Sequence, residues 1–354
     1  MKNYTALLHR DAYQKALSYM ESLKKGGAAG KYLQSKLNSH PLSKLSLDDF
    51  IELLMQTKVP QIFAETSVYG NGTDWNHSEL SILGDINISI PVTVFDNGKH
   101  DKPQAHSSPF DATLIFIAGA LLRNGKYHEP ADWNEVTINN EVNFESYYQL
   151  YKRRLLPALM YANQSAKSKG TTACITLSGI GCGQFAGQFK GQLGEQFKQV
   201  LKRILRDYSE QLLYIKAVYY DPFSECNNER HQINQITFLV RPLLQGNETK
   251  HQLCPPHQFE EHEDKFSECD LFSFVAWDHV SWPGNDFYSG NRITDDGVKS
   301  AATDAMYALT DIKGEYDVSL NKYMPPTPYK NWQEVVDNNK IQLHVKNNLI
   351  IVRE

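Results

Sequence analysis

The chain has 354 residues, 41% of them hydrophobic and 22% charged, which is enough to build the core of one large domain or two ordinary ones. Its formal net charge of -5 and isoelectric point near 6.2 argue against nucleic acid or an anionic membrane surface as the main partner. Five cysteines without a C-x-x-C pair favour a reducing compartment. The apolar run Ala112–Leu122 is too short to cross a membrane, and the amphipathic N-terminus is unlike a signal peptide.

Residues 1–80 predict a helical extension, or cap, in front of the main domain. The apolar residues of 4–23 are spaced as on one face of a helix, which Gly26-Gly27 would end. A second helix is expected to start at 46–49 and to run through Leu54, with a proline beyond its end. The polar, glycine-containing stretch Asn71–Ser81 predicts a loop.

Residues 81–330 predict an α/β domain. The expected strands are Asn87–Phe95, Thr113–Ile117, Thr171–Ser178, Leu212–Tyr220, Gln235–Leu243 and Asp270–Asp278. The last three are continuous apolar runs, typical of strands covered on both faces. We therefore expect a three-layer α/β/α fold with a mixed central sheet.

Three further elements complete the expected fold. Phe144–Ala166 predicts a long helix that Pro157 kinks or interrupts, and its triplet Lys152-Arg153-Arg154 is typical of a solvated helix face. Thr294–Thr310 predicts the last clear helix. Residues 331–354 predict a C-terminal β-hairpin packed on the core.

The stretch Ser178-Gly179-Ile180-Gly181-Cys182-Gly183 places three glycines between a strand and an expected helix. Apolar residues from Phe185 to Tyr208 form one stripe of that helix, and Gly183, Gly187 and Gly191 would leave one ridge of its first turns without side chains. Backbone N–H groups in such a turn, at the positive end of a helix dipole, favour phosphate binding. Alternatively, the glycines only join a strand to a closely packed helix. Cys182 is a candidate nucleophile there or, more simply, a small filler.

A second constellation follows the last apolar strand, in Val275–Gly297. Ligands of open α/β sheets bind beyond the carboxyl ends of strands, and this loop combines carboxylates with aromatic and turn residues. Capping of a helix that starts after Thr294 explains Asp295 and Asp296 in part. It does not explain Asp278 or Asp286, for which we expect a binding or catalytic role.

Metal sites are competing interpretations at two places. The carboxylates of this loop are of the type that binds Mg²⁺. The series His251, Cys254, His257 and His262 has zinc-ligand types at short spacing, but no matching second pair exists. We predict no metal and no cofactor.

The glycine turn TLSGIGCGQFAG together with WDHVSWPGNDFYSGNRITDDG resembles the macrodomain-type ADP-ribosylhydrolases found among Legionella effectors, and the match covers about residues 171–310. The resemblance implies a macrodomain-like fold with an ADP-ribose site, in which Asp278, Asp286 and Asp296 are catalytic. Gly84-Asp85-Ile86 is similar to an adenine-contacting element of that fold. The ADP-ribose-binding residues that it implies are Gly179, Ile180, Gly181, Cys182, Gly183, Gln184, Phe185, Trp277, Asn285 and Asp295.

The same resemblance implies an activity. It is hydrolysis of the N-glycosidic bond between ADP-ribose and an arginine side chain, with ubiquitin as the modified protein and a host ubiquitin-conjugating enzyme as a partner. It also implies a secreted bacterial effector that acts in the host cytosol. Two other functions stay open: a reader that binds ADP-ribose without cleavage, and a nucleotide-dependent oxidoreductase. The oxidoreductase is disfavoured because Asp221 lies too far beyond the glycine turn for a dinucleotide fingerprint.

Overall fold

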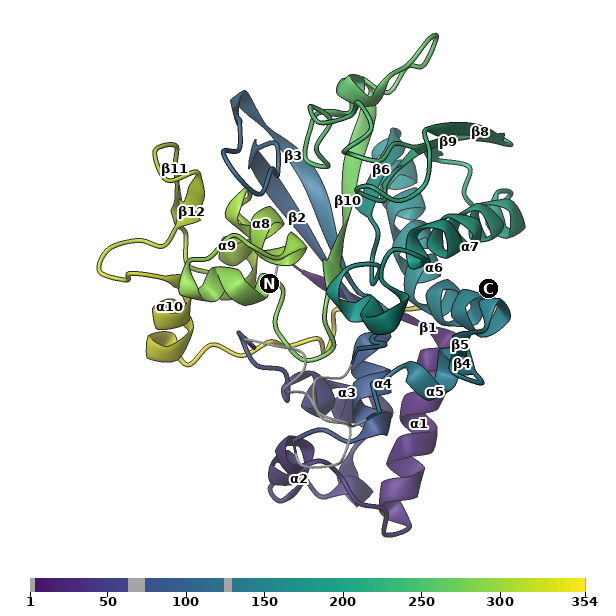
Figure 1. The fold of residues 1–354 in the computed structure, drawn as a ribbon. Helices are drawn as coiled ribbons and strands as arrows, with labels where there is room; N and C mark the ends of the chain where they lie inside the picture. Colours follow the sequence, from purple (N-terminus) through teal and green to yellow (C-terminus); the bar gives the residue numbers. More distant parts are fainter. Residues whose placement is uncertain (1–3, 63–73, 124–128, 354) are drawn as a thin grey trace.

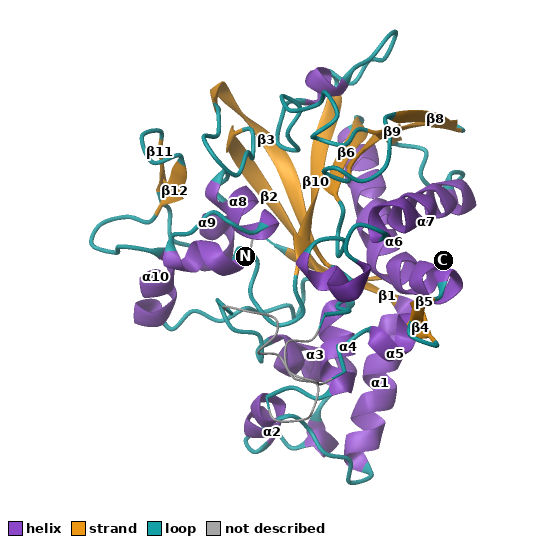
Figure 2. Ribbon diagram, viewed as in Figure 1, coloured by secondary structure: helices purple, strands orange, loops and turns teal. Residues whose placement is uncertain are grey.

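A nine-stranded sheet forms the centre of the molecule in the computed structural model, which describes residues 4–62, 74–123 and 129–353 (Figures 1 and 2). The strand order is β13-β1-β2-β3-β10-β6-β7-β9-β8. The strands are β1 (Thr5–His9), β2 (Ile86–Asp96), β3 (Ala105–Ala118), β6 (Thr172–Ser178), β7 (Ile215–Asp221), β8 (Glu229–Ile233), β9 (Ile236–Val240), β10 (Cys269–Trp277) and β13 (Leu349–Val352). Two small sheets pair β4 (Thr137–Ile138) with β5 (Glu141–Val142) and β11 (Glu315–Asp317) with β12 (Lys322–Met324).

The sheet is mixed, as the sequence predicts. Strands β3, β10, β6, β7 and β9 run parallel to one another, whereas β2 and β8 run antiparallel to their neighbours. In the centre, Leu271–Trp277 of β10 pairs in register with Ala112–Ala118 of β3. The carboxyl ends of the five parallel strands therefore meet at one edge of the sheet.

Helices cover both faces of this sheet, which confirms the three-layer α/β/α fold. In Figure 1, α6 (Phe144–Lys169) and α7 (Leu193–Tyr208) lie on one side, and α8 (Asp295–Ala301) and α9 (Ala305–Thr310) on the other. Side chains of β3 alternate between the two cores: Leu114 and Phe116 pack on the α8–α9 side, and Ile115 and Ile117 on the α6–α7 side. The remaining helices are α1 (Arg10–Lys24), α2 (Lys31–Leu37), α3 (Leu47–Met55), α4 (His77–Gly84), α5 (Trp133–Val136) and α10 (Trp332–Asn339).

The N-terminal segment differs from the expected cap at its first residues. Thr5–His9 is a strand inside the main sheet, between β13 and β2, so the expected helix begins only at Arg10. Leu7 and Leu8 are both fully buried, which a strand covered on both faces allows and a one-faced helix does not. The second helix is confirmed as α3, which Ser46 and Asp49 begin with a reciprocal capping box.

One expected loop is shorter, and one expected strand is longer, than the sequence indicates. Residues 77–81 of the loop expected at 71–81 belong to α4, where Asn76 and Glu79 form a capping box; residues 71–73 lie outside the described residues. Strand β3 begins at Ala105, well before Thr113, where the sequence predicts its start.

Three predictions about the helices and the C-terminus also need correction. The expected C-terminal hairpin is wrong, because the segment contains α10 and a single strand, β13, which pairs in parallel with β1. The expected helix 294–310 is two helices, α8 and α9. Pro157 does not interrupt helix α6, which runs from Phe144 to Lys169. In the described part of the chain, no helix has both the length and the apolar character needed to span a membrane.

Candidate functional site

A cavity of about 360 Å³ opens beyond the carboxyl ends of β6 and β10. It lies between the glycine turn, the end of β10 and the first turn of α8. It is lined by His100, Ser178, Gly179, Gly181, Gly183, Gln184, Phe185, Ala276, Trp277, Asp278, Asn285, Thr294, Asp295 and Asp296. The structure thus brings both sequence constellations to one site. Among the expected site residues, Ile180, Cys182 and Asp286 do not line the cavity.

The glycine turn offers backbone donors to this cavity. Within it, the N–H of Ile180 donates to Ser178 O at 2.9 Å and that of Cys182 to Gly179 O at 2.9 Å. The N–H groups of Gly181 and Gly183 have no acceptor among the described residues. Two unpaired N–H groups in one tight turn, on either side of Cys182, can donate to an anion, so the turn can hold a phosphate.

Gly181 has no room for a side chain. Its φ of +82° is a left-handed conformation, and a Cβ would lie 2.4 Å from the Tyr151 hydroxyl and 2.8 Å from Ala120 N. The same hydroxyl accepts from Ala120 N at 3.0 Å and donates to Ile180 O at 2.6 Å. The loop after β3 and the glycine turn are therefore tied together through Tyr151 of α6.

The helix expected directly after the glycine turn begins later. A short 3-10 segment, Gln184–Phe189, comes first, and α7 starts at Leu193. Gly187 and Gly191 have φ of +57° and +85°, so they break the helix instead of forming a ridge on it. The N–H of Gly194 in the first turn of α7 already donates to Glu225 Oε2 at 2.7 Å. The anion site therefore rests on the turn itself and not on the dipole of α7.

The side chains of the turn divide between the core and the cavity. Ile180 and Cys182 are buried in the core under α6 and α7. Burial raises the pKa of the Cys182 thiol well above its ordinary value, so it is not the nucleophile considered from sequence. Gln184 is exposed and accepts from Arg123 Nη1 at 2.7 Å, and the Phe185 ring lies 6.2 Å from that of His279.

Asp278 organises the loop that follows β10. Its Oδ1 accepts from the N–H groups of Val280 and Ser281, each at 2.7 Å, and its Oδ2 from the Ser281 hydroxyl and from Asn285 Nδ2 at 3.4 Å. The carboxylate is 4% exposed and lines the cavity. Asp278 is therefore held in one orientation by its own loop.

Asp286 stands behind the cavity wall, against the start of α8. Its Oδ2 accepts from Ile293 N at 2.7 Å and Thr294 N at 3.3 Å, and its Oδ1 from the Thr294 hydroxyl. A Cβ on Gly297 would lie 1.7 Å from Asp286 Oδ1, so this approach requires glycine. Asp286 thus positions the first turn of α8.

Asp295 and Asp296 project from that turn, which Thr294 caps as expected by accepting from Gly297 N at 3.2 Å. Asp295 Oδ2 accepts from Ala276 N at 2.7 Å and from Lys299 Nζ at 3.1 Å, which fixes α8 to the end of β10. Asp296 is 3% exposed, and no described residue bonds its Oδ2. Burial, and then the charge of Asp278, raise the pKa of Asp296 well above its ordinary value.

The sequence did not reveal a contribution from the segment after α3. Lys58, 3% exposed, donates to His279 O at 2.7 Å, and its ammonium lies 3.9 Å from the Trp277 ring centroid. Further along, Ile62 N donates to Asn285 Oδ1 at 2.7 Å. The N-terminal extension therefore packs directly against the site loop.

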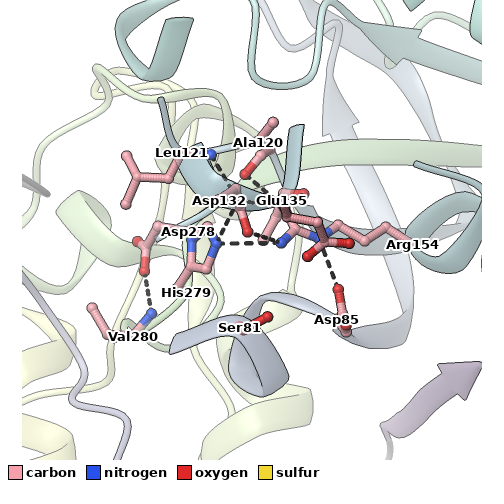
Figure 3. A network of polar contacts seen from close by, with 12 residues as sticks. Ser81, Asp85, Ala120, Leu121, Asp132, Glu135, Arg154, Asp278, His279 and Val280 are labelled. Carbon is pink, nitrogen blue, oxygen red and sulfur yellow. Dashed lines mark hydrogen bonds and ion pairs between the residues drawn. The ribbon is translucent and has the colours of Figure 1, made fainter. Parts of the chain in front are cut away.

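A buried ionic network also supports this loop (Figure 3). Arg154 is fully buried and donates to Asp132 Oδ1 at 2.7 Å and to Asp85 Oδ1 at 3.1 Å. His279, next to Asp278 in the chain, lies 3.1 Å from Asp132 Oδ2 through its Nε2. The network therefore joins α6 to the site loop.

Two sequence interpretations are wrong at this network. Arg153 and Arg154 are buried ion-pair partners and not part of a solvated helix face. Asp85, expected to resemble an adenine-contacting residue, has no exposed surface, and its Oδ2 accepts from Arg153 Nε at 2.6 Å and from Lys15 Nζ at 2.5 Å. Its carboxylate is therefore occupied within the protein.

The metal interpretations find no support in the donor geometry. Across residues 4–62, 74–123 and 129–353, no three His, Cys, Asp or Glu side chains lie close enough together to hold an ion. Cys254 instead donates to Thr249 O, and His251 is buried. The spacing of residues 251–262 therefore does not translate into a zinc site.

Comparison with known proteins identifies a family for this chain. A search of curated proteins finds no match. The family model of the macrodomain effector MavL matches residues 4–329, which is most of the chain and includes β1, the glycine turn and the site loop. The match indicates an ADP-ribose-related macrodomain function and a secreted bacterial effector. It confirms the resemblance noted from the sequence: the chain belongs to the family of the macrodomain effector MavL.

Proposed function

We propose that the protein is an ADP-ribosylhydrolase that cleaves the N-glycosidic bond between ADP-ribose and an arginine side chain. The observation that supports it most is the coexistence, in one cavity, of an anion-binding glycine turn and two buried aspartates, Asp278 and Asp296. The anion site can bind the diphosphate of ADP-ribose, and carboxyl groups can bind the ribose hydroxyls and assist cleavage of the glycosidic bond.

The glycine turn would bind the diphosphate through the N–H groups of Gly181 and Gly183, with Gly179 giving the backbone close access. Ile180 and Cys182 would contribute only backbone atoms, because their side chains are buried in the core. Phe185 and Trp277 offer aromatic surface to the ribose or base, and Asn285 and Asp295 keep the wall of the site in place.

Asp296 is the best candidate for the proton donor. A neutral guanidine nitrogen leaves poorly, so the reaction benefits from an acid, and burial beside Asp278 raises the pKa of Asp296, which favours the protonated form of this carboxyl. The C1″–N bond breaks with its electron pair going to the guanidine nitrogen, which takes the proton of Asp296. Water then adds its oxygen to C1″, and the proton that water loses returns to Asp296.

Asp278 would stabilise the positive charge that develops at C1″. Its carboxylate already has a fixed direction, set by three hydrogen bonds from Val280 and Ser281, so little reorganisation is needed during the reaction. Asp286, the third predicted catalytic residue, would act by positioning Thr294 and Asp296 and not by contact with the sugar.

We further propose that the modified protein is ubiquitin, that a host ubiquitin-conjugating enzyme is a partner, and that the protein acts in the host cytosol. The support for these is the resemblance in the site motifs together with the effector family.

The test uses ubiquitin that is ADP-ribosylated on arginine. The protein is incubated with it, with and without EDTA, and mass spectrometry follows free ADP-ribose and unmodified ubiquitin. We expect release that EDTA does not prevent. Asp296→Asn should lower kcat by about 100-fold or more, whereas Asp337→Asn, on the exposed surface of α10, serves as the matched control.

Three results would contradict the proposal. Tight ADP-ribose binding without release would make the protein a reader. Release abolished by EDTA would make the aspartates metal ligands. Full activity in the Asp→Asn variants of all three residues, Asp278, Asp286 and Asp296, would exclude them from catalysis.

A further inference from the structure

The hydroxyl of Thr294 lies between two carboxyl groups of the site. Its Oγ1 is 2.6 Å from Asp296 Oδ1 and makes a short hydrogen bond to Asp286 Oδ1. The same oxygen also accepts from the N–H of Gly297 at 3.2 Å. Three polar groups therefore surround one hydroxyl.

A count of protons and lone pairs restricts this arrangement. A hydroxyl has one proton to donate and two lone pairs to accept with. Gly297 uses one lone pair, which leaves one donor and one acceptor for the two carboxyl oxygens. An ionised carboxylate can only accept, so both cannot be ionised while both hydrogen bonds exist. One of the two groups must carry a proton and donate it to Thr294.

The partners of the two groups identify which one carries the proton. Asp286 Oδ2 accepts from two backbone N–H groups, those of Ile293 and Thr294, which stabilise a carboxylate. Asp296 has no such donor: its Oδ2 has no partner among the described residues, and the side chain is 3% exposed. The acid is therefore Asp296, and Thr294 donates its own proton to Asp286.

We propose that Thr294 is a positioning residue that keeps Asp296 protonated, by bridging it to the ionised Asp286 through a single shared hydroxyl. This inference deepens the proposed hydrolase function and rests on it for its catalytic meaning. The bridge gives Asp286 a role although it does not line the cavity. The negative charge of Asp286, which lies close to Gly297, attracts the hydroxyl proton of Thr294, so that this proton points away from Asp296.

The other charged groups near Asp296 either disfavour its ionisation, as nearby carboxylates do, or favour it, as the cation of Lys299 does. Asp278 and Asp295 add negative charge that disfavours ionisation of Asp296. Tyr288 is a buried neighbour of Asp296, and burial, followed by the charge of Asp296, raises the pKa of its phenol. Lys299 is the opposing cation, but its Nζ is bound to Asp295, Gln252 and Phe274 O. These groups stay unchanged when Thr294 alone is replaced.

The test compares two substitutions of Thr294. Thr294→Asn keeps a good helix cap, but its amide carries two N–H donors, so it can serve both carboxylates without any proton on Asp296. Thr294→Ser keeps the hydroxyl and is the matched control. The readout is the carbon-13 carboxyl shift of Asp296 against pH in the ligand-free protein, assigned by comparison with Asp296→Asn.

We expect the Asp296 carboxyl to remain protonated at pH 7 in the wild type and in Thr294→Ser, and its pKa to fall by at least one unit in Thr294→Asn. In the hydrolysis assay, kcat of Thr294→Asn should fall at least tenfold at pH 7, while its ADP-ribose Kd stays within about threefold of wild type. Melting temperatures of both variants check that α8 remains folded.

An Asp296 carboxyl that is ionised at pH 7 in the wild type, or that titrates equally in wild type and Thr294→Asn, would overturn the inference. The titration does not need turnover, so it separates this failure from failure of the proposed function. If the wild type releases no ADP-ribose but Asp296 titrates as expected, only the hydrolase proposal falls.

Discussion

Replacing Arg154 with methionine removes the cation at the centre of the buried network without shortening the side chain much. Arg154 has no exposed surface and bonds both Asp132 and Asp85, and it also donates to Gly119 O at 2.9 Å. Removing one partner of a buried ion pair costs about 3–5 kcal/mol, because the remaining charges are left uncompensated. We therefore expect Arg154→Met to lower the free energy of unfolding at pH 7 by about 4 kcal/mol.

The control is Arg203→Met, which breaks the ion pair of Arg203 with Glu145 on the surface of α7. The Arg203 side chain is 38% exposed and that of Glu145 56%, and such surface pairs contribute about 0–1 kcal/mol. Urea unfolding, followed by fluorescence and circular dichroism, measures both losses. A loss below about 1 kcal/mol for Arg154→Met, or one equal to that of the control, would refute the argument.

The pH dependence of the same variant has a defined sign. Burial alone would raise the pKa of Asp85 and Asp132, but their cations, Arg154 foremost for Asp132, hold both well below the ordinary value. In the wild type, the contribution of these two carboxylates to the free energy of unfolding is present in full above pH 3.8, the ordinary pKa of Asp, and is lost only below that pH. Without Arg154 the carboxyl groups take up protons at higher pH, so the deficit of Arg154→Met should shrink between pH 7 and pH 4.

Three further changes test other parts of the site. Burial lowers the pKa of Lys58 from 10.5 to about 7, so between these pH values the unfolded chain binds more protons than the folded one. The free energy of unfolding of the wild type, measured with urea relative to Lys58→Met, should therefore rise by about 2 kcal/mol from pH 7 to pH 9. A difference between the two proteins that does not change with pH would contradict this. Gly181→Ala should weaken ADP-ribose binding at least tenfold in calorimetry, because the added Cβ meets the Tyr151 hydroxyl. The control Gly246→Ala has a similar φ of +83° but open space around the added Cβ, and it should bind ADP-ribose normally. Equal binding by the two variants would show that the clash at residue 181 is relieved. Tyr151→Phe should cost about 1–3 kcal/mol in thermal unfolding, because it leaves the buried N–H of Ala120 unpaired, and an unchanged melting temperature would count against this bond.

The parts of the site that the sequence predicts are those that local pattern encodes. A glycine cluster after an apolar strand, and a carboxylate-rich loop after another, located the two segments, and the family resemblance then named most of the residues that line the cavity. The topology of a parallel sheet then brings both loops to one edge, which makes their proximity predictable as well. The exact start of α7 was not predictable, because Gly187 has a φ of +57° and lies close to Leu122 and Arg123 of the loop after β3, a contact between segments distant in the chain.

The parts that the sequence did not predict depend on contacts between distant residues. Arg154 was assigned to a solvated face from its charge, although Leu150 and Ala158, four residues before and after it, are fully buried on the same face of α6. That spacing was the available signal, and it indicates burial. Nothing near Lys58 in the chain indicates its contact with Trp277 and His279, because that contact joins segments more than 200 residues apart.

These long-range contacts explain why the N-terminal extension is part of the site and not an appendage. Strand β1 lies inside the sheet, between β2 and β13, and Lys58 and Ile62 bond the loop that carries Asp278 and Asn285. The side chain of His279, in the same loop, contacts Asp132. These contacts fix the loop and so keep Asp278 in place without help from a ligand, which is the preorganisation that the proposed electrostatic role of Asp278 requires. The boundary predicted at residue 80 therefore falls between β1 and β2, two strands that pair directly in one sheet.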